Sequence, residues 1–204
     1  MVIVKILFDE RKNGFLFTSE DDETFLVSYE TYLRLNLHAP CNPSLEQEKI
    51  LREEDARFRA ASLALSYASY QPRTEHEVLC RLQREKIAPD AAEAAVAKLR
   101  REGWLDDASY AKRYGEDKLR KGWSLRHIAG GLRQKGIDVA RIRETLSSFH
   151  QDEEVETLRR LAQKKYGRRD LSDSKEFERT VQALCRRGFP LEAVLRILKE
   201  MRET

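Results

Sequence analysis

Cysteine and aromatic residues are scarce in this chain of 204 residues, and long apolar runs are absent. Aromatic residues make up 8% of the sequence, and the three cysteines are Cys41, Cys80 and Cys185. An odd number without paired spacing excludes a disulfide framework and a structural zinc site, so we expect free thiols in a reducing cytoplasm. No run of about eighteen apolar residues occurs, which excludes a membrane-spanning helix, and the apolar start MVIVKILF lacks a signal-peptide cleavage site.

The short motifs of common catalytic sites are also missing. The sequence has no glycine-rich phosphate loop, no GxSxG elbow and no HExxH pair, and its four histidines lie in unrelated contexts. The adjacent Asp106 and Asp107 would face different directions on a helix, so they suit helix capping better than metal binding. We therefore expect a protein that is not an enzyme and that binds no cofactor or metal ion.

Charged residues, at 36% of the chain, are unevenly distributed. The net charge is −5 over residues 1–54, +1 over 55–106, +5 over 107–150 and +2 over 151–204. A concentration of positive charge in one section indicates a polyanion or an acidic protein surface as the partner. Ordinary solvated helix faces account for any single cation equally well.

Residues 1–43 predict a small antiparallel β extension with a short helix. Asn13-Gly14 separates two apolar runs, and both positions tolerate positive φ, which favours a hairpin. The polar turn SEDDET leads to a third short strand, and YETYLRLNL follows as a short helix. Because three short strands are marginal alone, we expect this sheet to pack on a downstream element.

After Pro43 the pattern predicts helices only, starting at Ser44 with Gln47 three residues later as a capping box. The similar segments LQREKIA, LRQKGID and LCRRGFP recur about every fifty residues. Each belongs to a unit of helix, turn, helix, tight turn and helix. The predicted fold is therefore mainly α, a tandem array of three three-helix repeats over residues 44–106 (with a long leading helix), 107–150 and 151–204.

The tight turn of each repeat carries a residue that ends a helix. Gly136 and Gly188 adopt the left-handed conformation without a Cβ conflict, and Ile137 and Phe189 then fold back onto the core. Lys86 takes this place in the first repeat, so we expect its cap to be strained or differently shaped.

Basic residues crowd the second repeat and the start of the third. Tyr110, Tyr114 and Trp123 are interleaved with them, and cations beside rings are typical of a nucleic-acid surface. The same rings suit the core of the repeat equally well. The candidate partner- or nucleic-acid-binding residues are Lys112, Arg113, Lys118, Arg120, Lys121, Arg126, Arg133, Lys135, Lys164, Lys165, Arg168 and Arg169.

The segment GWLDDASYAKRYGEDKLRKGWSLRHIAGGLRQKGID, residues 103–138, resembles the RecX family, the bacterial regulators of the RecA recombinase. The family pattern is glycine-aromatic-Leu-Asp-Asp, a Tyr-Ala pair, a basic stretch, a glycine and a Leu-x-x-Lys-Gly-Ile ending, and this segment contains each part in order. Arg73, Thr74 and Glu77 match the first repeat of the family. The resemblance covers residues 55–204, and the amino-terminal strands are similar to the extension of longer members.

Two departures from the family pattern concern helix stability. Lys86 replaces a turn glycine, and Gly131 replaces an acid. The pair Gly130-Gly131 inside a helix should weaken that helix by about 1 kcal/mol per glycine relative to alanine.

The resemblance implies a cytoplasmic regulator, active in DNA recombination, DNA repair and the SOS response, that binds RecA filaments on single-stranded DNA. It also implies modulation, most often inhibition, of RecA ATP hydrolysis, strand exchange and co-protease activity. Duplex DNA would bind more weakly, and we expect a monomer that does not contact membranes. The alternatives are a tandem helix-turn-helix transcription regulator and a helical scaffold for an acidic protein.

Overall fold

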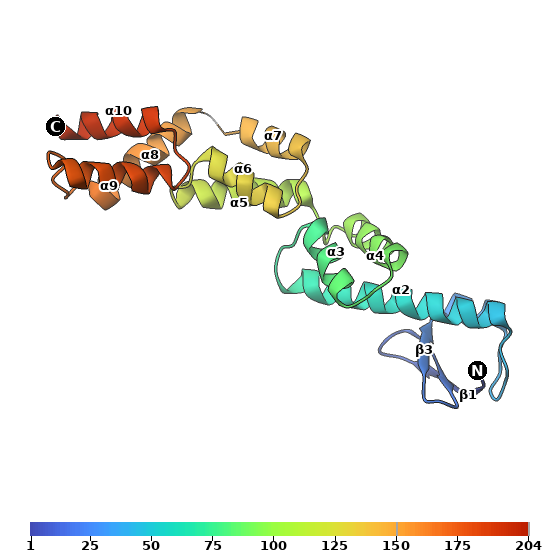
Figure 1. Ribbon diagram of the computed structural model, residues 1–204. Coiled ribbons are helices and arrows are strands. Elements are labelled where there is room, and N and C mark those ends of the chain that lie inside the picture. The colour runs from blue at the N-terminus through green and yellow to red at the C-terminus, as the bar shows by residue number, and fades with distance from the viewer. Residues whose placement is uncertain (150, 204) are drawn as a thin grey trace. The chain divides into compact units, whose positions relative to one another are not determined.

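The computed structural model describes residues 1–149 and 151–203, and the chain divides into two compact units, Met1–Leu105 and Asp106–Thr204. His150 and Thr204, at which the second and third repeats are predicted to end, lie outside the described residues. Helices dominate both units, and the strands of the described chain all lie near the amino terminus (Figure 1). No helix in the described ranges has the length and apolar character needed to cross a membrane.

The amino-terminal strands form an antiparallel sheet in the order β1-β2-β3. The elements of this extension are β1 (Ile3–Asp9), β2 (Gly14–Ser19), β3 (Thr24–Val27) and α1 (Tyr29–Leu35). Asn13 has a φ of 50°, and Gly14 pairs with Asp9 across the turn, so the predicted hairpin is confirmed. The mainly α fold with a small β-rich extension is confirmed as well.

The sheet packs on the long helix α2 (Leu45–Tyr70), as the sequence predicts (Figure 1). Phe17 and Val27 from the sheet share one buried cluster with Leu51 of the helix. Asp55 of α2 accepts a hydrogen bond from the backbone N–H of Leu26 at 3.0 Å, which satisfies a donor at the edge of the sheet. The helix therefore supplies the burial that three short strands lack alone.

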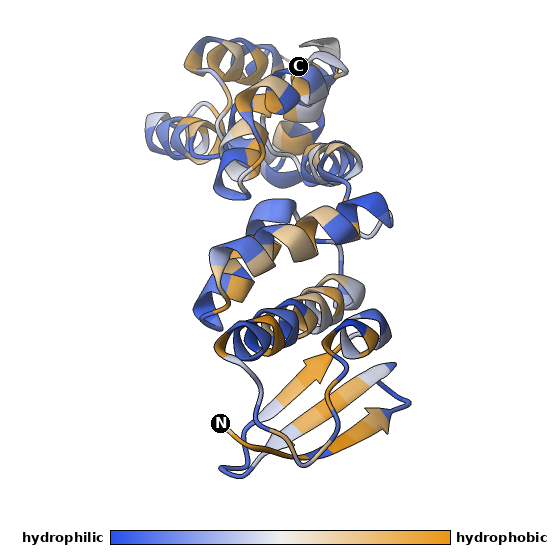
Figure 2. Cartoon of the chain, turned by 90° about the vertical axis from the view of Figure 1, so that its right-hand side faces the viewer, coloured by the Kyte–Doolittle hydropathy of each residue, from blue (hydrophilic) through white to orange (hydrophobic). Residues whose placement is uncertain are grey.

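Three three-helix repeats follow one another along the chain, which confirms the predicted array. The first contains α2, α3 (Glu75–Arg84) and α4 (Pro89–Arg101). The second contains α5 (Asp107–Arg120), α6 (Leu125–Gln134) and α7 (Val139–Ser147), and the third α8 (Gln151–Tyr166), α9 (Ser174–Cys185) and α10 (Leu191–Arg202). Leu82, Leu132 and Leu184 are completely buried, each in the apolar cluster of its own repeat. Figure 2 shows that many of the helices carry hydrophobic residues on one side and hydrophilic residues on the other.

The second helix of every repeat ends in a left-handed turn. Gly136 and Gly188 have φ values of 76° and 89°. The N–H groups of Ile87 and Ile137 each donate to the carbonyl five residues earlier at 3.1 Å, the hydrogen bond of a Schellman motif. Lys86 adopts a φ of 57° in the first repeat. Its cap therefore has the same shape as the glycine caps and is strained by the lysine Cβ.

The two glycines inside α6 have different surroundings. A Cβ on Gly131 would collide with the hydroxyl oxygen of Tyr114, so the close approach of that ring requires a residue without a side chain. A Cβ on Gly130 would meet no heavy atom within 4 Å. Packing against Tyr114 therefore explains the glycine at position 131. No comparable contact with a described residue explains the glycine at position 130.

We predict opposite effects of alanine at these two neighbouring positions. Gly130→Ala should raise the free energy of unfolding by about 0.5–1 kcal/mol, because alanine favours the helix and its methyl group enters open space. Gly131→Ala gains the same propensity but forces Tyr114 to move, so it should lower the free energy of unfolding. Urea unfolding followed by circular dichroism measures both values, and stabilisation of equal size in the two variants would contradict this account.

Candidate nucleic-acid and protein interface

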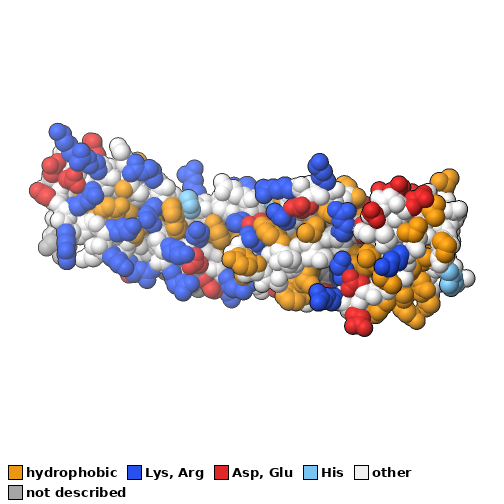
Figure 3. All heavy atoms as spheres, turned by 90° about the horizontal axis from the view of Figure 1, so that it is seen from below, with side chains coloured by type: hydrophobic (Ala, Val, Ile, Leu, Met, Phe, Trp, Pro, Cys, Tyr) orange, Lys and Arg blue, Asp and Glu red, His pale blue; other side chains and the backbone are white. Residues whose placement is uncertain are grey.

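All twelve candidate cations lie in the unit Asp106–Thr204, on three helices and the residues directly after them. Helix α5 and its C-cap carry Lys112, Arg113, Lys118, Arg120 and Lys121; α6 and its C-cap carry Arg126, Arg133 and Lys135; α8 and the turn after it carry Lys164, Lys165, Arg168 and Arg169. Figure 3 shows Lys and Arg side chains gathered on one face of this unit.

Part of the positive charge on α5 is neutralised within the helix. Asp117 accepts a hydrogen bond from Lys121 Nζ at 2.7 Å and lies 3.7 Å from Arg120 Nη2. The hydrogen bond from Lys121 is the largest of the effects that lower the pKa of the Asp117 carboxyl below its ordinary value. Lys118 Nζ lies 5.1 Å from the centre of the Tyr114 ring. The pairs with Asp117 are individually weak, but its carboxylate offsets part of the positive charge that α5 offers to a partner, whereas the neutral Tyr114 ring leaves the charge of Lys118 unchanged.

Several of the candidates form no ion pair with any described residue. They are all exposed, and they are Lys112, Arg126, Arg133, Lys164, Lys165 and Arg168. Arg169, in contrast, pairs with Glu176 at 3.1 Å and lies over the ring of Tyr166. The charge available to a partner therefore comes from all three helices rather than from α5 alone.

The aromatic rings between these cations contact other parts of the chain. Tyr114 packs against the buried cluster of the second repeat, and its ring centre lies 6.2 Å from that of Tyr110. Trp123 stacks on His127 with ring centres 4.0 Å apart, and the Arg187 guanidinium lies 4.8 Å from the Trp123 ring centre. The core interpretation is confirmed for Tyr114, and Trp123 belongs to a contact between the second and third repeats.

Arg187 is absent from the candidates, although its segment LCRRGFP marks the third repeat. Its Nη1 atom donates to the carbonyl oxygens of Lys121 and Gly122 at 3.0 and 3.1 Å, at the carboxyl end of α5. A helix dipole favours a cation at this end. The Arg187 carbonyl in turn accepts the N–H of Ser124 at 3.3 Å. These contacts join the second and third repeats. The one feature of the sequence that could have indicated this role for Arg187 is its place in an arginine pair before a turn glycine.

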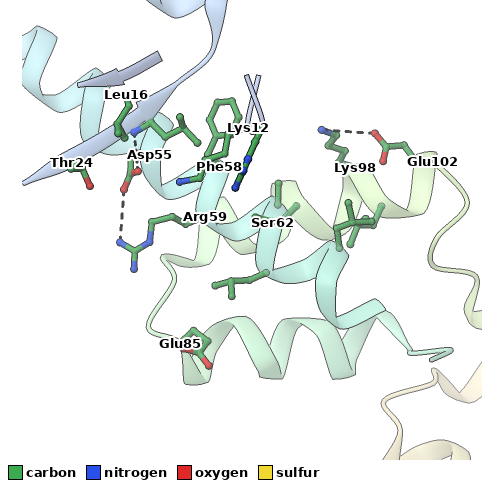
Figure 4. Close-up of a pocket in the computed structure, with 17 residues that line it drawn as sticks. Lys12, Leu16, Thr24, Asp55, Phe58, Arg59, Ser62, Glu85, Lys98 and Glu102 are labelled. Carbon is green, nitrogen blue, oxygen red and sulfur yellow. Dashed lines mark hydrogen bonds and ion pairs between the residues drawn. The ribbon is translucent and has the colours of Figure 1, made fainter. Parts of the chain in front are cut away.

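The unit Met1–Leu105 contains a cleft of about 780 Å³ between the sheet, α2 and α4 (Figure 4). Two ion pairs lie among the residues that line it. Arg59 Nη1 is 3.8 Å from Asp55 Oδ2, and Lys98 Nζ is 3.9 Å from Glu102 Oε1. The other carboxylate oxygen of Asp55, Oδ1, accepts the backbone N–H of Leu26 in β3. No group of three or more His, Cys, Asp or Glu side chains in the described part of the chain is placed to hold a metal ion.

Asp106, one of the two adjacent aspartates that the sequence offers as a helix cap, is the N-cap of α5. Its Oδ1 atom accepts the N–H groups of Ala108 and Ser109 at 3.0 and 2.9 Å. The hydrogen bonds from Ser109 are the main effects that lower the pKa of the Asp106 carboxyl. All three cysteines are free thiols, also as expected.

Comparison with known proteins matches the three repeats to three family models in chain order. Residues 60–99 match "RecX, first three-helix domain", residues 106–146 the second such domain and residues 152–198 the third. Each matched segment corresponds to one of the helical repeats, and the second begins at Asp106, the N-cap of α5.

Relatives and solved structures agree with these models. A regulatory protein RecX from Finegoldia magna is 32% identical over 68% of this chain and 68% of its own length. One from Lactobacillus johnsonii is also 32% identical, over 78% of this chain, and the match spans 59% of that relative's length. A crystal structure of regulatory protein RecX has a TM-score of 0.73 at 25% identity, covering 97% of this chain and 98% of the other. For RecX from Lactobacillus salivarius the TM-score is 0.64 at 27% identity, covering 74% and 99%. This chain belongs to the RecX family of regulatory proteins.

Proposed function

We propose that this protein binds filaments of the RecA recombinase on single-stranded DNA and inhibits their ATP hydrolysis, strand exchange and co-protease activity. The observation that carries the proposal is the match of all three repeats, in order, to the RecX family. Membership of this family implies RecA as the partner. Because the matched relatives are called regulatory proteins, we assign the chain a regulatory role without a catalytic step.

The distribution of unpaired cations supports a polyanionic or acidic partner. They lie on α5, α6 and α8 and in the turn after α8, in two repeats that share one unit, while residues 1–54 have a net charge of −5. Single exposed cations contribute little, but several contacts along one polymer combine through effective concentration. We therefore assign the filament contact to the unit Asp106–Thr204. We further propose that the protein acts as a cytoplasmic monomer in recombination, DNA repair and the SOS response.

The proposal is tested by titrating ATP hydrolysis by the RecA protein of the same bacterium on single-stranded DNA. We predict a clear fall in the hydrolysis rate well below one molecule of this protein per RecA, because each bound molecule affects a continuous polymer. An unchanged rate at equimolar protein would contradict the proposed function. Tight binding of the same protein to one duplex sequence, measured separately, would favour a transcription regulator instead.

Charge reversal in the third repeat should weaken this inhibition. We predict that Lys164→Glu together with Arg168→Glu raises the concentration for half-inhibition roughly tenfold or more, because two exposed cations without ion-pair partners are replaced by anions. The matched control is Arg84→Glu with Arg101→Glu, which reverses two exposed arginines of the unit Met1–Leu105 that also form no ion pair with the described residues. The control should inhibit like the unaltered protein. Equal loss in the two double variants would refute the assignment of the contact.

A further inference from the structure

Helix α6 buries one side and leaves the opposite side open. Ile128 and Leu132 are completely buried in the core of the second repeat. At about 100° per residue, Arg126, Gly130 and Arg133 fall on the other side, in one line along the helix axis. Both arginines are exposed. These three residues are called the α6 face below.

Gly130 leaves a gap in the α6 face that the folded chain does not fill. A Cβ there would meet no heavy atom within 4 Å, whereas a Cβ on Gly131 would collide with Tyr114. Glycine inside a helix lowers its stability relative to alanine, so packing within the chain gives no reason for glycine at this position. Gly130 itself is half-buried, and a glycine with open space at its Cβ position also allows the backbone of another molecule to come close.

The surroundings of the α6 face are positive. The sequence contains no Asp or Glu between Asp117 and Asp138. Asp117 is already bonded to Lys121. Neither arginine of the α6 face forms an ion pair with a described residue. The guanidinium groups therefore keep their full charge for a partner.

Two contacts from the third repeat complete this arrangement. Glu154 accepts the N–H of Leu125 at 2.9 Å, so its carboxylate is occupied by the amino end of α6. Arg187 lies over Trp123, whose ring stacks on His127, the neighbour of Arg126 in the chain. The third repeat thus places a further guanidinium over the ring of Trp123, just before the amino end of α6.

The chemistry of this surface fits a nucleic acid better than a protein. Protein interfaces have apolar or aromatic centres, and none of the large exposed hydrophobic side chains of the described chain belongs to α6. Interfaces with nucleic acids are polar and strongly positive, and guanidinium groups bind phosphate through paired hydrogen bonds.

We propose that the α6 face binds the sugar–phosphate backbone of a single DNA strand. Arg126 and Arg133 bind phosphates, and the gap at Gly130 lets the strand approach the helix between them. The choice of a single strand rests on the proposed function, but binding to the strand does not require RecA. Within the positive surface, the α6 face contacts the DNA. Arg120 and Lys121, the cations at the end of α5 that pair with Asp117, do not contact it.

The experiment measures binding of the full-length protein to a fluorescent oligothymidylate by anisotropy over a range of salt concentrations, without RecA. For a single strand, the slope of log K against log salt changes by about 0.7 per phosphate contact. Arg126→Ala with Arg133→Ala should therefore reduce the magnitude of the slope by about 1.4. Arg84→Ala with Arg101→Ala is the matched control and should leave the slope unchanged.

A second variant tests the gap itself. Gly130→Leu should weaken binding by the same factor at every salt concentration and leave the slope unchanged, because it blocks close approach without removing charge. Ala140→Leu places the same side chain at an exposed position of α7 and should bind like the unaltered protein. Thermal unfolding of each variant shows that the fold is retained.

The outcomes separate this inference from the proposed function. An unchanged slope in the double arginine variant, or no binding of the oligothymidylate by the unaltered protein, would overturn the inference. Loss of RecA inhibition with an unchanged DNA slope would overturn it too, since the α6 face would then contact protein. The expected slope change in a protein that leaves RecA hydrolysis unaffected would support the inference and refute the proposed function.

Discussion

The binding surface depends on how the unpaired backbone groups at two helix ends are satisfied, namely the carboxyl end of α5 and the amino end of α6. A helix leaves unpaired carbonyl groups at its carboxyl end and unpaired N–H groups at its amino end. Here Arg187 donates to the carbonyls that end α5, and Glu154 accepts an N–H at the start of α6. A three-helix repeat has a small core, so contacts between repeats are a substantial part of its stability. Arg187 and Glu154 both belong to the third repeat, so their contacts join it to the second repeat. The cations of α6 and α8 therefore lie in one compact unit.

Ion pairing within helices decides which cations are available to a partner. The carboxylate of Asp117 lies one turn before Lys121 and pairs with it, and Arg169 pairs with Glu176. The arginines of α6 have no acid at comparable spacing, because the sequence around them contains none. A count of basic residues therefore overstates the contribution of α5, where Asp117 pairs with Arg120 and Lys121, relative to that of α6.

Features with short-range causes could be predicted from the sequence. The hairpin at Asn13-Gly14, the cap at Asp106 and the helix ends at Gly136 and Gly188 depend on residues a few positions apart. The periodic recurrence of these helix ends was enough to predict three repeats. Lys86 shows how strongly the pattern holds, since the same turn forms there in spite of the strain of a Cβ at positive φ.

Contacts between residues distant in sequence could not be predicted in the same way. Arg187 reaches the end of α5 across 65 to 66 positions, and its role depends on how the third repeat packs on the second. Gly131 is explained only by the ring of Tyr114, which lies on another helix. The difference between Gly130 and Gly131, on which the α6 face depends, is therefore visible in the structure and not in the sequence.

Hydrogen–deuterium exchange of the protein, measured with and without RecA filaments on single-stranded DNA, tests the central claim most directly. The account predicts that the filament slows exchange in peptides from α5, α6 and α8 and leaves exchange in β1, β2 and β3 unchanged. Slowed exchange confined to the unit Met1–Leu105 would contradict it.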